Sequence, residues 1–165
     1  MPSGLDKELG ILASNAARVT ASAPSPYAKA KLLEKWFSTS GGFVYDTQGP
    51  TGLEQNALTE FLQNKHGYCV QFASSMALMA RLLHIPSRVD VGFTGGTARG
   101  SGTFVVASTD SHAWPELYFD GIGWVRRDAL VQTLQATHGL TFSLSNLEAL
   151  VMVPEIVALY GTADE

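Results

Sequence analysis

A change of hydrophobic period near residue 85 limits the possible folds more than any other feature. Up to about residue 83, apolar residues recur at helical spacing, which predicts helices over residues 5–23, 25–40, 57–65 and 70–83, with a short extended segment at 43–45. From residue 87 the period becomes two. Four short segments rich in Val, Phe, Tyr and Trp, separated by glycine-containing turns, then predict strands at 87–93, 103–108, 112–119 and 123–128. Helices followed by a strand meander predict an α+β fold with an antiparallel sheet.

Composition indicates one ordinary globular domain over residues 1–165. The 165 residues are 45% hydrophobic and 16% charged, and the net charge is −4 at pH 7. Because no basic stripe is present, nucleic acid is not an expected partner. No apolar run reaches the ~20 residues that span a bilayer, so we expect no direct membrane insertion by this chain.

Cys69 is the only cysteine, and it lies where a helix is predicted to begin. One cysteine cannot form an internal disulfide, and four scattered histidines give no zinc ligand cluster. Two interpretations of Cys69 remain, a catalytic nucleophile and an inert thiol in the core. No metal or other cofactor is expected. The preceding residues His66, Gly67 and Tyr68 offer no good capping side chain, which leaves the first-turn N–H groups free to face a thiolate or an oxyanion.

A nucleophilic cysteine needs a base, and His112 is the best-placed histidine. It opens a predicted strand, with Trp114, Glu116 and Tyr118 on its own face, whereas the alternate positions are apolar. A structural histidine is the competing interpretation.

The carboxylate that orients His112 is predicted to be Asp128. In the proposed hairpin of the last two strands, paired positions sum to about 240 or 241, which sets Asp128 opposite His112 or Ala113. Asp110, two residues before His112, is the alternative. The glycine-rich segment 92–102 lacks the following helix and the ending of a phosphate-binding loop, so we expect a mobile hairpin loop near the site.

Three segments together resemble the transglutaminase-like domain of papain-like cysteine enzymes. They are GYCVQFASSMALMARLLHIPSR, DSHAWPELYF and GIGWVRRDAL, which begin at Gly67, Asp110 and Gly121. The match covers about residues 61–128 and is closest to the extracytoplasmic domains of bacterial membrane proteins of the TgpA type. His84 stands where that family usually has glycine, a position that favours a left-handed residue. Residues 131–165 carry no pattern of the family, and 126–130 depart from its usual D/E-P-T ending.

The resemblance implies a papain-like fold and a catalytic triad of Cys69, His112 and Asp128. It implies acyl transfer on a protein or peptide amide through a thioester, with water or an amine as acceptor, and a periplasmic or extracellular location. The Cys69 backbone N–H would serve as one oxyanion donor. Gln71, Tyr45 and Trp114 are candidates for the second donor or for substrate binding. A non-catalytic binding or structural module that keeps the fold is the alternative function.

Overall fold

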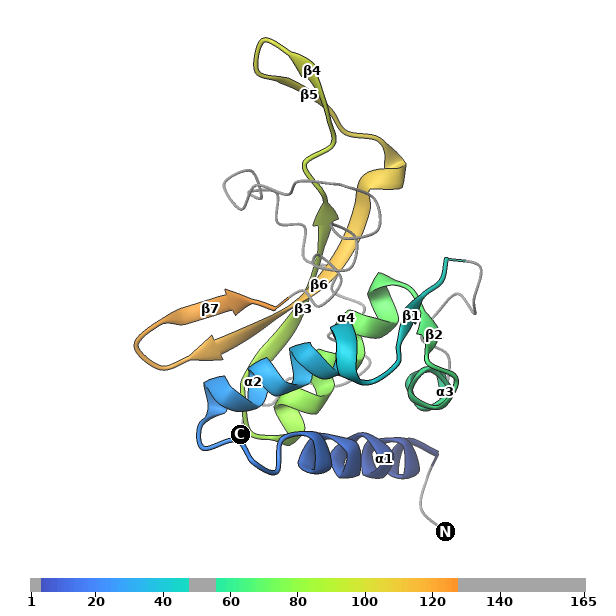
Figure 1. Cartoon of the computed structure of the whole chain (residues 1–165), viewed down its shortest axis with the longest axis vertical. Coiled ribbons are helices and arrows are strands. Elements are labelled where there is room, and N and C mark those ends of the chain that lie inside the picture. The colour runs from blue at the N-terminus through green and yellow to red at the C-terminus, as the bar shows by residue number, and fades with distance from the viewer. Residues whose placement is uncertain (1–3, 48–55, 128–165) are drawn as a thin grey trace.

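The computed structural model describes residues 4–47 and 56–127 (Figure 1). The helices are α1 (Gly4–Val19), α2 (Pro26–Lys35), a π-helical turn (Trp36–Ser40), α3 (Ala57–Asn64), α4 (Cys69–Leu82) and a 3₁₀ turn (Ser108–Asp110). The strands are β1 (Val44–Tyr45), β2 (His66–Gly67), β3 (Ser87–Phe93), β4 (Thr97–Gly100), β5 (Thr103–Val105), β6 (Ser111–Phe119) and β7 (Gly123–Arg126). No helix in the described ranges is long and apolar enough to cross a membrane.

An antiparallel sheet with strand order β3-β6-β7 lies against helix α4. On β6, the face that carries Ala113, Leu117 and Phe119 joins the hydrophobic core, and the other face carries His112, Trp114 and Glu116. Helices α1, α2 and α3 surround the remaining sides of α4 (Figure 1). The predicted α+β class with an antiparallel sheet is confirmed.

Helix α4 is buried along most of its length because nearly all its residues from Cys69 to Ala80 face other elements. At its carboxyl end the N–H of His84 bonds to the Arg81 carbonyl and that of Ile85 to the Ala80 carbonyl, a Schellman motif. His84 has a φ of 61°, so the left-handed conformation predicted at this position is confirmed. The helix therefore ends sharply, and the chain turns directly into β3.

Three predictions about the strands are wrong. Paired positions in the β6–β7 hairpin sum to 242, not 240 or 241, because Gly123 already pairs with Phe119 and only three residues form the connection. The hairpin loop predicted over residues 92–102 contains a strand, since residues 97–100 form β4 and pair with β5. The strand predicted to run to residue 108 ends at Val105, and a 3₁₀ turn follows.

Candidate active site

The Cys69 side chain lies at the first position of α4 and is 8% exposed. Its helix has no side-chain cap hydrogen bond at Tyr68, as the sequence predicts. Instead, the Tyr68 N–H donates to Gln71 Oε1 over 3.1 Å, which fixes the entry of the chain into the helix. The positive end of the helix dipole therefore meets the sulfur, and this favours the thiolate.

A short parallel bridge between β1 and β2 places Tyr45 beside this helix end. The Val44 N–H donates to the Lys65 carbonyl over 2.7 Å, and the Asp46 N–H donates to the Gly67 carbonyl over 2.8 Å. A Cβ on Gly67 would come within 2.7 Å of the Phe61 ring, so only glycine lets the chain pass this close to the aromatic core. Phe61 in turn packs on Phe72 of α4, with ring centroids 4.8 Å apart.

His112 contacts Cys69 from the beginning of β6. The imidazole is 4% exposed and forms a hydrogen bond with the thiol, and the Ala113 backbone N–H and the Tyr45 side chain form two more. Burial raises the pKa of Cys69, but the hydrogen bond and charge of His112, followed by the bonds from Ala113 and Tyr45, outweigh burial and leave the pKa below its ordinary value. This arrangement stabilises a thiolate next to a group that can carry its proton.

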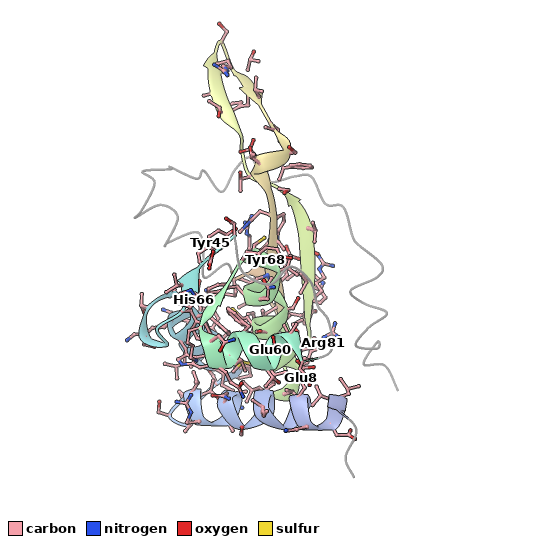
Figure 2. The ribbon with its side chains drawn as sticks, turned by 90° about the vertical axis from the view of Figure 1, so that its right-hand side faces the viewer. Glu8, Tyr45, Glu60, His66, Tyr68 and Arg81 are labelled. Carbon is pink, nitrogen blue, oxygen red and sulfur yellow. The ribbon has the colours of Figure 1, made fainter. Side chains whose placement is uncertain are left out.

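The three predicted accessory residues have different surroundings. Tyr45 reaches the sulfur, as described, and Figure 2 shows Tyr45 and Tyr68 at about mid-height, between α1 at the bottom and the β4–β5 hairpin at the top. The Gln71 carbonyl oxygen is engaged by the Tyr68 backbone. Trp114 is buried beside His112, with ring centroids 6.3 Å apart, and the Arg126 guanidinium lies 4.0 Å above the indole. Trp114 therefore has both the imidazole and the guanidinium as ring neighbours.

The two predicted orienting carboxylates cannot be compared directly, since Asp128 lies outside the described residues. Asp110 belongs to the 3₁₀ turn before β6, where its Oδ2 accepts the Ala107 N–H over 2.7 Å. This bond gives Asp110 a local role in closing the turn.

A buried carboxylate that the sequence reasoning missed lies on the His112 face of the sheet. Asp90 of β3 pairs with Trp114, is 1% exposed, and has no hydrogen-bond partner for either oxygen among the described residues. Its nearest cation is Arg88, 3.5 Å away, which gives its two hydrogen bonds to Glu116 instead. Burial and the neighbouring Glu116 carboxyl raise the pKa of Asp90 to about 6, despite the opposing charges of Arg88 and Arg126. The sequence pattern does not indicate this burial, because it places Asp90 on the strand face of Arg88 and Gly92, opposite the apolar Val89, Val91 and Phe93.

No group of three or more His, Cys, Asp and Glu side chains within residues 4–47 and 56–127 is arranged to hold a metal ion.

Comparison with protein families gives one match over most of the chain. The sequence model described as the transglutaminase-like superfamily matches residues 13–129, a range that contains Cys69 and His112.

Two curated proteins and a solved structure are similar to the chain. The uncharacterized protein YebA of Bacillus subtilis is 29% identical over 149 residues, which cover 86% of this chain and 19% of YebA. A protein-glutamine gamma-glutamyltransferase of Pseudomonas aeruginosa is 33% identical over 92 residues, which cover 54% of this chain and 14% of that protein. The crystal structure of the periplasmic domain of TgpA from Pseudomonas aeruginosa, bound to ethylmercury, has a TM-score of 0.66 and 28% identity over 75% of this chain and 45% of that one. The chain thus spans less than a fifth of the curated relatives.

Proposed function

Because the chain belongs to the transglutaminase-like superfamily, we propose that it transfers acyl groups from peptide or side-chain amides, with Cys69 as nucleophile and His112 as proton carrier. The hydrogen bond between these two side chains, at the start of a buried helix, carries the proposal. A lone buried thiol without a histidine beside it would have favoured a structural role.

The proposed reaction has two halves. The Cys69 thiolate attacks the amide carbonyl carbon, a C–S bond forms, and the C–N bond breaks as the His112 imidazolium gives its proton to the leaving amine. Water or a primary amine then attacks the thioester, His112 takes the proton of the attacking group, and the C–S bond breaks to restore the thiolate. Water gives hydrolysis, and a lysine amine gives transamidation.

The negative charge that develops on the substrate carbonyl oxygen during the reaction must be stabilised by hydrogen-bond donors near Cys69. The Cys69 backbone N–H at the helix start is one, and we propose Tyr45 as the other, since its side chain forms a hydrogen bond with the sulfur. Trp114 acts in this proposal as a positioning residue for His112.

Asp128 remains the proposed orienting residue, because Asp110 already accepts the Ala107 N–H. Asp128→Asn is expected to reduce turnover by about 10³ to 10⁴, and Asp110→Asn by less than about tenfold. The reverse order would transfer the orienting role to Asp110.

Thiol reactivity separates an enzyme from a non-catalytic module. We expect Cys69 to react with iodoacetamide at about pH 6 faster than free cysteine does, and we expect His112→Ala to abolish this advantage. Mass spectrometry of a peptide library, incubated with and without a primary amine donor, would identify cleaved, deamidated or cross-linked products. An alkylation rate no faster than that of free cysteine, with the same products from Cys69→Ala protein, would contradict the proposal.

The name of the Pseudomonas relative, a protein-glutamine gamma-glutamyltransferase, favours testing transamidation first. A glutamine-containing peptide that gains the mass of the amine would identify the acceptor as an amine. Loss of ammonia without added amine would identify water.

A further inference from the structure

We propose that the β4–β5 hairpin binds the acyl-donor polypeptide as an extended, apolar segment and guides it toward Cys69. We call residues 94–107 the arm. This inference rests on the proposed function, since it assigns a substrate class to the same site.

The arm leaves the sheet next to His112. On β3, Gly92 pairs with His112 and Phe93 with Ser111, and the Thr94 N–H then donates to the Asp110 carbonyl over 2.8 Å. Figure 1 shows β4 and β5 projecting away from the helices beyond this end of the sheet. A chain that lies along the arm therefore arrives at the histidine.

Apolar side chains are exposed along the second strand of the arm and at its base. They are each between 45% and 51% exposed: Phe93, Phe104, Val105 and Val106. Large apolar side chains grouped on an exposed surface indicate a binding site, whereas scattered ones do not. The turn at the far end, Gly100–Gly102, is small and polar. The turn itself therefore offers no apolar side chain to a lipid surface, and the exposed apolar side chains lie on and after β5, the strand that runs back toward His112.

The backbone of the arm can also bind an extended peptide. Among the described residues, β4 and β5 pair only with each other, and all their residues are exposed. Each strand therefore has an outer edge of backbone donors and acceptors that an extended peptide can join, and side-chain contacts at alternate positions would add selectivity. Arg99 is the only charged residue of the arm, so the preferred segment is uncharged or acidic.

Strand geometry sets the length of the segment. The chain from Gly92, opposite His112, to Thr97, opposite Val105, spans at most about 17 Å at ~3.3 Å per residue. An extended substrate needs five or six residues to cover the same path. Peptides shorter than this would reach Cys69 without touching the apolar part of the arm.

The test measures binding without turnover, so it is independent of catalysis. Cys69→Ala protein is titrated with a fluorescein-labelled peptide of about twelve residues, in which Val and Thr alternate on both sides of a central glutamine, and with a shortened peptide of about four residues. Fluorescence anisotropy gives the dissociation constants. The arm variant is Phe104→Ser with Val106→Ser, and the matched control is Ile122→Ser, an exposed apolar side chain in the β6–β7 turn.

We expect the arm variant to weaken binding of the long peptide by about tenfold or more and to leave the short peptide unchanged, while Ile122→Ser changes neither. Equal affinity of the arm variant and the parent for the long peptide would overturn the proposal. So would an equal loss with Ile122→Ser, arm-dependent binding to phosphatidylcholine vesicles without a peptide effect, or arm-dependent self-association without one. Absence of turnover with normal arm-dependent binding would overturn the proposed function alone.

Discussion

Asp90→Asn is predicted to make the protein more stable at neutral and alkaline pH. Asp90 is buried on the His112 face of the sheet, and neither carboxylate oxygen has a hydrogen-bond partner among the described residues. Arg88 is nearby, but it donates both of its hydrogen bonds to Glu116. An ionised Asp90 is therefore a poorly compensated buried charge, whereas an amide of the same shape carries no charge.

The size of the effect follows from the pKa of Asp90, which rises to about 6 in the folded protein. In the unfolded chain the group ionises near its ordinary value of about 3.9. Between these two values the folded state binds more protons than the unfolded state, so the folding stability falls as pH rises through this window. At 1.36 kcal/mol per unit, about two units correspond to a loss of up to about 3 kcal/mol, which is nearly complete about one pH unit above the folded pKa.

Urea unfolding followed by circular dichroism, from about pH 4 to about pH 8, measures this loss. The difference between variant and parent is the useful quantity, because other titrating groups contribute equally to both. It should shift in favour of Asp90→Asn by up to about 3 kcal/mol as pH rises, with most of the change below about pH 7. Asp120→Asn, at an exposed position in the β6–β7 turn, controls for the loss of one negative charge. A difference that does not change with pH, or that favours the parent at high pH, would refute the reasoning.

Three further substitutions test other parts of the structure. His84→Gly should raise the free energy of unfolding by up to about 1 kcal/mol, because glycine adopts the φ of 61° without a Cβ penalty, and urea unfolding measures it. Glu8→Ala should lower it by about 1 to 3 kcal/mol, because two buried N–H groups at the start of α3 lose their acceptor, while exposed Lys7→Ala should have little effect. Tyr45→Phe should reduce kcat by about 10² and move the alkylation profile of Cys69 to higher pH; an unchanged profile would remove Tyr45 from the site.

The proposed nucleophile and base could be selected from the sequence because both depend on local signals. Cys69 was recognisable from its place at the start of an apolar helix, and His112 from the alternation along its strand. Their contact is a tertiary feature, and it was predictable only because the family resemblance links the two motifs in order. The left-handed His84 was predictable for the same reason.

Other features depend on residues far apart in the chain and left no local signal. Glu8 lies about fifty positions from the α3 N–H groups whose hydrogen bonds it accepts. No residue near Asn56 indicates that a side chain of α1 caps the start of α3. The predicted register of the β6–β7 hairpin was wrong because Gly123 pairs with Phe119 instead of belonging to the turn. A period-two pattern does not show which residue is the last of a turn. Asp90 was missed because the strand pattern places it on the polar face with Arg88, whereas the folded protein buries that position.

The site is assembled from two separately supported parts, and this determines which substitutions should affect it. Cys69 and Tyr45 are held by the β1–β2 bridge and the aromatic cluster around Phe61, whereas His112 is held by the β3–β6 ladder. Helix α4 joins the parts, since Arg81 at its carboxyl end donates two hydrogen bonds to the Ser87 carbonyl at the start of β3. Removing the Arg81–Ser87 hydrogen bonds should change the distance between the Cys69 thiol and the His112 imidazole without altering the immediate surroundings of either side chain. Reactivity of Cys69 therefore depends on contacts at both ends of α4, not only on the residues that touch the sulfur.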